Sequence, residues 1–366
     1  MVKIVITGAS GNVGTGLLRA LAADSSEHEV VGVCRRPPEA VPPYDSVRWQ
    51  SCDLAADDAP DVLDEVLRDV DAVVHLAWMF QPVRDGARMQ RTNFKGTSAV
   101  LSAARRAGVP QIVHCSSISA YAPTSAAPVT EQAATSGVPG SAYGEGKAEA
   151  EALVARFAED NPDIAVATIR PTLVAQAAAS ASFLALFFDP LVPRQLFSLL
   201  RRGKIPLVPL PSQLKVQLVH SDDVGDAIVR ILRTRARGPF NIAADTLTTH
   251  DLAAAAGGRP LPVPTGVMRA MVRLLWRARV LHMSPGWFDV GTRSPLIDTS
   301  RAREELGWTP RTSSTACARE QLSGIADATH LPSPVLRRDR FKTERRNSRS
   351  AADRRQLRAK AATTPL

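Results

Sequence analysis

The chain has 366 residues, enough to bury a large core, and its hydrophobic fraction of 45% is that of an ordinary globular protein. Its formal net charge of +9 is concentrated at the C-terminal end: residues 337–366 hold eleven Lys or Arg and three Asp or Glu, so the rest of the chain is nearly neutral. The longest apolar region, residues 183–200, contains Asp189, Arg194 and two prolines, which excludes a membrane span.

The four cysteines form neither a CxxC pair nor a spacing typical of metal ligands, so we expect no metal site. Small buried thiols, and a first strand without a preceding signal peptide, favour a reducing, cytoplasmic setting. The basic tail, residues 326–366, lacks periodic apolar residues and is expected to be disordered. A solvated tail without a specific role is the simplest interpretation, and contact with nucleic acid, acidic lipid or an acidic partner stays open.

Residues 2–16 (VKIVITGASGNVGTG) combine a β-branched strand, a glycine-studded turn and the start of a helix. Gly8 allows a sharp turn, Gly11 lets the backbone approach a pyrophosphate, and Gly14 lets the helix pack tightly on the strand. The free N–H groups at the start of the helix then face the anion. The spacing G-x-x-G-x-x-G differs from the commoner G-x-G-x-x-G, but its place directly behind a strand predicts a dinucleotide site.

The second strand, residues 29–34, is followed by Arg35 and Arg36. An NAD site usually has a carboxylate here, which holds the adenosine ribose hydroxyls and repels a 2′-phosphate. A guanidinium can instead pair with that phosphate through two hydrogen bonds. The pattern therefore favours NADP over NAD, the alternative being that both arginines are solvated loop residues.

Strands and helices alternate regularly up to residue 171. This pattern predicts an α/β fold with a doubly wound parallel sheet, on which ligands lie at the carboxyl ends of the strands. The strands are expected at residues 2–6, 29–34, 47–51, 72–76, 111–115 and 164–169, and the main helices at 60–70, 85–107 and 141–160. The residues that follow these strands are Gly8, Arg35, Asp53, Ala77, Ser117 and Pro171.

The regular alternation ends at Thr172. We therefore expect a dinucleotide-binding domain over residues 1–171 and a smaller substrate-binding annex over 172–325, with some annex segments returning to the core. The annex is predicted to contain strands at 216–219 and 240–242, and helices at 221–235, 266–281 and 301–306. In the first of these helices we interpret Asp222 and Asp223 as N-terminal caps.

Tyr143 and Lys147 lie four residues apart on the helix predicted over 141–160, so the phenol and the ammonium share one face. The ammonium and a cationic nicotinamide ring both favour the phenolate, which lowers the pKa of the phenol from about 10. Tyr143 would then transfer a proton while the coenzyme moves a hydride, and Ser117 would donate a hydrogen bond to the same substrate oxygen.

These motifs together resemble the extended short-chain dehydrogenase/reductase family, the group that includes NAD(P)-dependent epimerases and dehydratases. The resemblance covers residues 2–320. It includes TGASGNVG from Thr7, SS from Ser116, YGEGK from Tyr143, RP from Arg170 and DTSRAREELGWTP from Asp298.

The resemblance implies a Rossmann fold with a defined set of site residues. The backbone at Gly11, Asn12 and Val13 would hold the pyrophosphate, with Gly8 and Gly14 shaping the turn. The adenine would contact Asp53 and Leu54, and the nicotinamide would lie near Leu76, Ala77 and Pro171. The catalytic set would be Ser117, Tyr143 and Lys147, with Lys147 also holding the nicotinamide ribose. A homodimer built on helices 85–107 and 141–160 is implied as well.

Two departures from the family pattern bear on the substrate. Ile118 and Ser119 occupy the place where 4,6-dehydratases carry an Asp-Glu pair, and Val216 replaces an arginine that pairs with the diphosphate in sugar-nucleotide enzymes. Because three phenylalanines, Phe183, Phe187 and Phe188, lie in the annex, the pocket is expected to be more apolar than ionic, although Arg194, Arg201 and Arg202 could serve a phosphate.

The sequence thus favours an NADP(H)-dependent oxidoreductase that interconverts a carbonyl and an alcohol on a small, fairly apolar substrate. An epimerase that oxidises and re-reduces one carbon with a retained NAD is the alternative. A third hypothesis is a dinucleotide-sensing regulator whose tail binds nucleic acid or a partner. The Tyr143/Lys147 pair disfavours it, because family members that became sensors tend to lose this pair.

Overall fold

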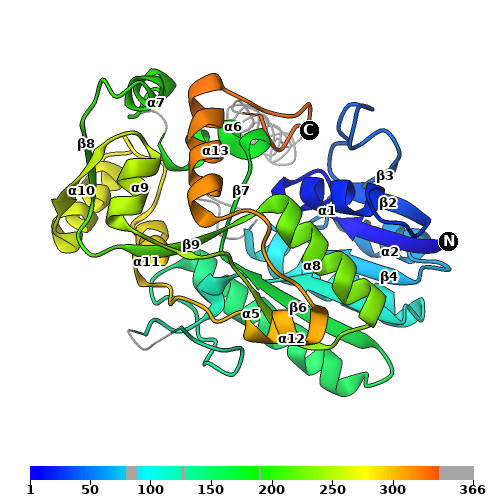
Figure 1. Cartoon of the computed structure of the whole chain (residues 1–366). Helices are drawn as coiled ribbons and strands as arrows, with labels where there is room; N and C mark the ends of the chain where they lie inside the picture. The colour runs from blue at the N-terminus through cyan, green and yellow to red at the C-terminus, as the bar shows by residue number, and fades with distance from the viewer. Residues whose placement is uncertain (80–88, 125–127, 189–190, 338–366) are drawn as a thin grey trace, which may run out of the picture.

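The computed structural model describes residues 1–79, 89–124, 128–188 and 191–337. Seven parallel strands form the central sheet in the order β10-β6-β5-β4-β1-β2-β3 (Figure 1). The strands are β1 (Val2–Thr7), β2 (His28–Cys34), β3 (Arg48–Ser51), β4 (Ala72–His75), β5 (Gln111–Cys115), β6 (Ala165–Pro171) and β10 (Gly238–Ile242). The predicted α/β fold with a doubly wound parallel sheet is therefore confirmed.

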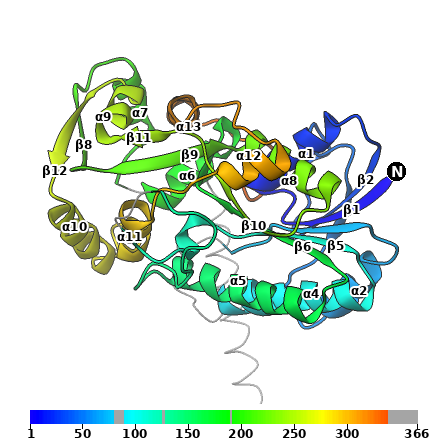
Figure 2. The ribbon, with the colours of Figure 1, turned by 60° about the horizontal axis from the view of Figure 1, so that its bottom comes forward.

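Helices cover both faces of this sheet. One face carries α1 (Asn12–Ala22) and α8 (Ser221–Thr234). The other carries α2 (Ala59–Val66), α4 (Gly96–Arg106) and α5 (Ala142–Asp160), which lie side by side in Figure 2. Strand alternation divides the core accordingly: Ile4 and Ile6 pack toward α1 and α8, whereas Val5 packs toward α2 and α4. Of the helix predicted over 85–107, residues 85–88 lie outside the described chain.

The annex contains two small sheets and most of the remaining helices. Strands β7 (Leu173–Ala175), β9 (Lys215–His220) and β11 (Thr246–Thr248) form one sheet, and β8 (Leu207–Pro211) pairs with β12 (Arg259–Val263) in the other. The longer helices are α6 (Ser180–Phe187), α7 (Arg194–Arg201), α9 (Thr249–Ala255), α10 (Thr265–Arg277), α11 (Pro285–Arg293), α12 (Ser300–Leu306) and α13 (Ser314–Asp327). Of the short helical turns, η1 (Arg91–Lys95) and η2 (Ile118–Ala120) lie within the first 171 residues, and η3 (Ala177–Ala179) lies in the annex.

The interpretation of Asp222 and Asp223 as caps of α8 is wrong. His220 caps this helix, because its Nδ1 accepts a hydrogen bond from the Asp222 N–H at 3.2 Å. Asp222 instead accepts a hydrogen bond from Arg19 on α1, at 2.7 Å. Asp223 accepts from the backbone N–H groups of residues 311 and 312, at 3.0 and 3.1 Å. Both carboxylates therefore connect segments that are distant in the sequence rather than capping the start of α8.

The ordered chain continues past the tail boundary predicted at residue 326. Helix α13 ends at Asp327, and Ser333 and Leu336 are buried beyond it. The Ser333 hydroxyl donates to the carbonyl of Ser10, in the glycine turn, at 2.7 Å. Leu331 packs against the core and Leu336 is buried, and two apolar side chains are too few for a periodic signal in the sequence. The rest of the predicted tail, residues 338–366, lies outside the described chain.

Candidate active site

The glycine turn after β1 is shaped by close backbone contacts. Gly8 has φ +76°, and a Cβ there would lie 2.7 Å from the backbone nitrogen of Ala77, at the end of β4. A Cβ on Gly14 would lie 2.4 Å from the carbonyl oxygen of Ala9, so α1 packs directly on the turn. Helix α1 begins without a side-chain cap and without an acidic residue in its first turn. This cradle fits a dinucleotide pyrophosphate at the helix N-terminus.

Asn12 connects the glycine turn to the annex. Its side-chain amide donates to the carbonyl of Val174 on β7 at 2.8 Å and accepts from Gln176 at 2.6 Å. The amide oxygen of Gln176 in turn accepts from Arg19, at 2.8 Å. The sequence predicted only a backbone role for Asn12 and did not identify Gln176. The two lie more than 160 positions apart, so no local pattern relates them.

The residues predicted for the adenosine end lie at the edge formed by β2 and β3. Arg35 and Arg36 follow β2 and are partly buried. The Ser51 hydroxyl donates to the carbonyl of Arg35 at 3.2 Å, which joins the ends of the two strands. Asp53 follows β3 and accepts from the Ala55 N–H at 3.2 Å. The structure brings these residues together, and their coenzyme contacts stay predictions.

The hydroxyl groups of Ser117 and Tyr143 lie together beyond the end of β5. Ser117 begins the short helix η2, and its hydroxyl accepts from the Ser119 N–H at 3.2 Å. Helix α5 approaches η2 closely, since a Cβ on Gly144 would lie 2.9 Å from the Ser119 carbonyl oxygen. This contact places Tyr143, the preceding residue, beside Ser117. Burial raises the pKa of Tyr143 well above its ordinary value, and a hydrogen bond with Ser117 partly opposes that rise.

Lys147 lies one turn further along α5 and is buried. Its ammonium donates to the carbonyl of Cys115 at 2.8 Å and lies 3.7 Å from the ring centroid of Trp78. Burial lowers the pKa of Lys147 to about 8. The expected lowering of the Tyr143 pKa by this ammonium is not observed, because burial is the largest influence on the phenol and raises its pKa.

An aromatic cover lies on Tyr143. The ring of Trp287, on α11, is 4.3 Å from the Tyr143 ring, and Phe187, on α6, meets Trp287 edge-on at 5.6 Å. Phe183 continues the row 4.6 Å from Phe187. Trp78 approaches Tyr143 from another side at 6.4 Å. The sequence indicated the phenylalanines but not the two tryptophans, although Trp78 directly follows the predicted contact residue Ala77.

Trp78 also carries an unused hydrogen-bond donor. Its Nε1 is buried and has no hydrogen-bond partner within the part of the chain that the structure describes. A buried donor of this kind next to Lys147 is suited to a polar ligand group, because an unpaired buried N–H is costly. Together with the glycine cradle, it indicates that the site fits a dinucleotide and its substrate.

A buried network of ion pairs and hydrogen bonds holds the end of β5, next to Ser117. Arg170, at the end of β6, donates to the Glu151 carboxylate at 2.7 Å and to the Tyr121 hydroxyl at 2.7 Å. Glu151, on α5, also accepts from the Ser116 hydroxyl at 2.6 Å. Because Ser116 precedes Ser117 in the chain, this network fixes the end of β5 relative to α5.

Two buried histidines lie close to the site in their neutral form. His75 and His114, on neighbouring strands, stack with ring centroids 5.6 Å apart. His75 bonds to the hydroxyls of Thr7 and Thr97, at 2.7 and 2.9 Å. Burial lowers the pKa of His75 to about 3 and holds the pKa of His114 well below its usual range. Both rings are therefore neutral near pH 7, and neither is a general acid there.

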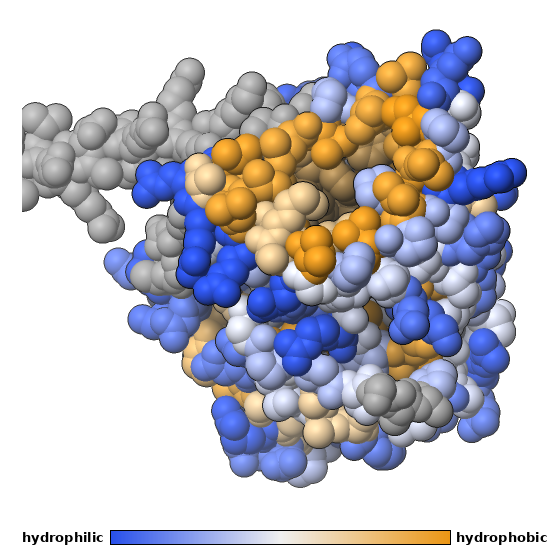
Figure 3. All heavy atoms as spheres, turned by 90° about the vertical axis from the view of Figure 1, so that its left-hand side faces the viewer, coloured by the Kyte–Doolittle hydropathy of each residue, from blue (hydrophilic) through white to orange (hydrophobic). Residues whose placement is uncertain are grey.

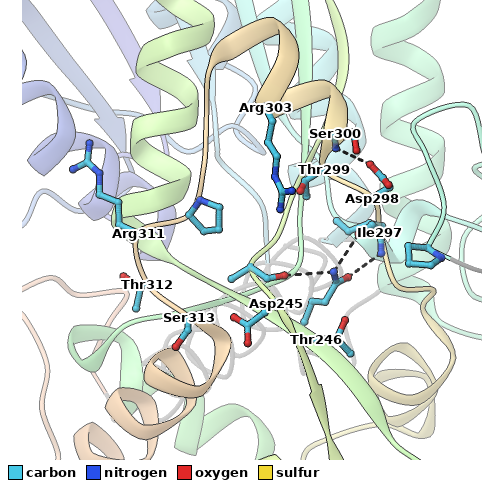
Figure 4. Close-up of a pocket in the computed structure, with 14 residues that line it drawn as sticks. Asp245, Thr246, Ile297, Asp298, Thr299, Ser300, Arg303, Arg311, Thr312 and Ser313 are labelled. Carbon is cyan, nitrogen blue, oxygen red and sulfur yellow. Dashed lines mark hydrogen bonds between the residues drawn. The ribbon is translucent and has the colours of Figure 1, made fainter.

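A separate pocket of about 460 Å³ opens between β9, β11 and the segments around α12 and α13 (Figure 4). Gln217 lines it and is used structurally: its side chain accepts from the Ile297 N–H at 2.8 Å and donates to the Ile297 carbonyl at 3.1 Å. None of the predicted coenzyme-binding or catalytic residues lines this pocket. The neighbouring Val216 packs into an apolar cluster with Leu218 and Leu247.

Comparison with known sequences gives one family. The sequence model of the NAD dependent epimerase/dehydratase family matches residues 4–243. An uncharacterised protein of Mycobacterium tuberculosis is 28% identical over 324 residues, which are 87% of this chain but only 29% of that protein. The chain therefore spans less than a third of the first relatives it matches. The UDP-glucose 4-epimerase of Vibrio cholerae is 25% identical over 84% of this chain and 90% of that enzyme.

Solved structures share the fold. The UDP-glucose 4-epimerase of Stenotrophomonas maltophila, with bound NAD and formylated UDP-arabinopyranose, has a TM-score of 0.68 and 21% identity over 90% of this chain and 99% of that chain. The UDP-glucose 4-epimerase of Thermotoga maritima, with UDP-glucose, has a TM-score of 0.67 and 18% identity over 89% and 99%. At these identities the comparison establishes the architecture rather than the substrate.

Proposed function

The chain belongs to the NAD dependent epimerase/dehydratase family, and on this basis we propose that it interconverts a carbonyl and an alcohol on a small, fairly apolar substrate with an NAD(P) coenzyme. The observation that carries the proposal is the position of the Tyr143 phenol. It lies between the Ser117 hydroxyl and the aromatic cover of Trp287 and Phe187.

Each residue of the site has a distinct role in this proposal. The cradle around Gly8 and Gly14 holds the pyrophosphate, and the nicotinamide, when bound, supplies or accepts the hydride. Ser117 donates a hydrogen bond to the substrate oxygen and so fixes its position. Tyr143 gives a proton to that oxygen on reduction and takes it on oxidation. Lys147 holds the nicotinamide ribose hydroxyls with the donors that it does not use on the Cys115 carbonyl.

The surroundings of Tyr143 support an apolar substrate. The row formed by Trp287, Phe187 and Phe183 offers ring faces and edges next to the phenol rather than charged groups. Val216 packs in an apolar cluster, and Gln217 is bonded to the backbone of residue 297, so neither is arranged to pair with a diphosphate.

A coenzyme-turnover assay tests the proposal. The chain is incubated with NADPH or NADH and a panel of aliphatic and aromatic aldehydes and ketones, and loss of reduced coenzyme is followed by its absorbance. We expect oxidation of one equivalent of coenzyme per carbonyl reduced. Absence of turnover over the whole panel, with epimerisation of a nucleotide sugar and no net coenzyme change, would contradict the proposal.

The family comparisons favour a second candidate, a sugar-nucleotide epimerase with a retained NAD. This chain covers 90% of the UDP-glucose 4-epimerase of Vibrio cholerae and 99% of each of the two solved UDP-glucose 4-epimerases. The two candidates differ in one measurable property, because an epimerase returns its hydride to the same carbon. Incubation with UDP-glucose should then give UDP-galactose without added coenzyme.

We expect Arg35 and Arg36 to select the coenzyme. Replacing both by Gln should weaken NADPH binding by roughly 10- to 100-fold, because charge-assisted hydrogen bonds to the 2′-phosphate are lost. NADH binding should change little. The measurement is a fluorescence titration with each coenzyme, and Arg48→Gln, on the exposed edge strand β3, is the matched control. Equal loss for both coenzymes would show that the arginines do not recognise the phosphate.

The affinity for coenzyme should fall as the pH rises through about 8. Burial lowers the pKa of Lys147 to about 8, so the ammonium is present below that pH and lost above it. The neutral amine is a weaker donor to the ribose hydroxyls. Titrations between slightly acidic and alkaline pH should show this decline, and Lys147→Met should bind weakly at every pH. A decline that persists in Lys147→Met would assign the titration to another group.

A further inference from the structure

An exposed apolar face covers the side of the annex that carries α7, β8 and α10. Figure 3 shows the apolar side chains of this side gathered into one band around a hollow. The most exposed of them are Leu274 and Val267, with 67% and 61% of their surface accessible. We call this surface the annex face, and its members are Leu196, Leu199, Leu207, Leu261, Val267, Met271 and Leu274.

Helix α10 carries two neighbouring apolar stripes, which lie about 100° apart around its axis. Its inner stripe, Met268, Val272 and Leu275, packs against Leu281 and Phe288 in a small core. Its outer stripe repeats at the same spacing, with Val267, Met271 and Leu274 exposed. The apolar part of the helix surface is thus wider than the part that the annex buries, and the opposite side carries Arg269, Arg273 and Arg277. The outer stripe therefore needs an apolar neighbour that the described chain does not supply.

The two chain segments that carry the annex face contain basic residues and no acidic ones. Residues 191–220 contain five Lys or Arg and no Asp or Glu. Residues 252–288 likewise contain five Arg and no Asp or Glu. Arg269 pairs with the buried carboxylate of Asp289 at 2.7 Å, and Arg201 pairs with Asp327 at 2.8 Å. Arg273 and Arg277, on α10, form no ion pair with a carboxylate of the described residues. Exposed leucines between such cations match a surface that is both apolar and anionic.

We propose that the annex face binds the surface of an anionic lipid bilayer. The outer stripe of α10 and the leucines of α7, β8 and β12 enter the acyl boundary, and the surrounding guanidinium and ammonium groups contact lipid phosphates. Docking is peripheral: no helix within the described residues is long and apolar enough to cross a bilayer. This inference goes beyond the proposed function and does not depend on it.

The charges argue against the other occupants of this face. In a symmetric dimer the same patch would meet itself, so two surfaces without carboxylates in residues 191–220 and 252–288 would repel each other. The chain's own C-terminal residues 337–366 are also strongly basic and would be repelled in the same way. A lipid phosphate layer above an apolar interior complements both properties of the face.

Helices α10 and α11 connect the annex face to the site. Helix α10 packs against α11, and α11 packs against α5. Trp287, which covers Tyr143, belongs to α11. A bilayer bound to α10 would therefore lie on a helix that packs directly against the one carrying Trp287.

Vesicle sedimentation with the full chain tests the proposal. The probes are vesicles of phosphatidylcholine alone and of an equal mixture of phosphatidylcholine and phosphatidylglycerol. We expect binding to the mixed vesicles, weakened at high salt, and little binding to phosphatidylcholine alone. The variant Met271→Gln/Leu274→Gln should lower partitioning about tenfold or more, because it removes apolar contacts without changing any charge. The control Val2→Gln/Val41→Gln changes two exposed apolar residues outside the annex and should bind like the parent.

Each outcome decides the proposal. If the basic tail alone held the vesicles, the α10 variant would bind as well as the parent, and the proposal would be overturned. Equal binding to both vesicle types would show that binding does not depend on anionic lipid, which contradicts the proposal. A chain that ignores vesicles but forms a dimer disrupted by Met271→Gln/Leu274→Gln would assign the face to a second copy. Equal thermal unfolding of the variant and the control excludes misfolding as the cause of lost binding.

Discussion

Replacing Tyr143 by Phe is expected to lower the turnover number by about three orders of magnitude, within the range typical of a lost general acid. The change removes one oxygen atom and keeps the ring that Trp287 covers at 4.3 Å. Coenzyme affinity should stay unchanged, because the cradle at Gly8 and the ammonium of Lys147 are not altered. Steady-state kinetics with the best carbonyl substrate and a coenzyme titration check the two parts separately.

The chain offers a matched control for this experiment. Tyr44 is fully buried, and its hydroxyl lies 2.9 Å from that of Thr15, outside the catalytic set. Tyr44→Phe removes the same atom and should change turnover by less than about fivefold, the effect of one neutral hydrogen bond. Full turnover by Tyr143→Phe would reject the assignment of this phenol as the proton donor.

Breaking the Glu151–Arg170 pair is expected to cost about 3–5 kcal/mol of folding free energy. Both side chains are more than nine-tenths buried, so Glu151→Ala leaves a guanidinium without its carboxylate in the interior. Unfolding by urea measures the loss. Asp163→Ala breaks the exposed Arg105–Asp163 pair, whose atoms are 2.7 Å apart, and should cost less than about 1 kcal/mol.

A double variant separates the charge effect from simple packing. Glu151→Leu/Arg170→Met removes both charges and keeps most of the volume, so it should recover a large part of the stability lost in Glu151→Ala. It should still turn over slowly, because Ser116 loses its carboxylate partner and no longer fixes Ser117. If the double variant were less stable than Glu151→Ala, the buried charge would not be the source of the cost.

Local sequence patterns were sufficient to predict the central sheet and the glycine turn after β1. The β-branched run at residues 2–6 and the glycines that follow lie within one strand-turn-helix unit, so composition and spacing predict their structure directly. Tyr143 and Lys147 were identifiable for the same reason, since both lie on one helix. The strand pair β8 and β12 was missed because prolines interrupt both segments, and proline is unusual inside strands.

Contacts between distant segments could not be predicted in this way. Trp287 covers Tyr143 although it lies 144 residues later in the chain. Gln176, in the annex, donates a hydrogen bond to Asn12, in the glycine turn. The rise in the pKa of Tyr143 was not predicted, because the position of a residue on one helix does not show how deeply the packed elements bury it. Such features arise from how whole elements pack, which a single sequence does not encode locally.

The contact between Ser333 and Ser10 has a practical consequence for shortening the chain. A protein cut after residue 325, where the sequence placed the end of the annex, would lose the last two residues of α13 and the hydrogen bond from Ser333 to the glycine turn. A cut after residue 337 keeps the Arg337–Glu39 pair and the buried Leu336, and removes nearly all of the excess positive charge. Crystallisation trials should therefore begin from residues 1–337.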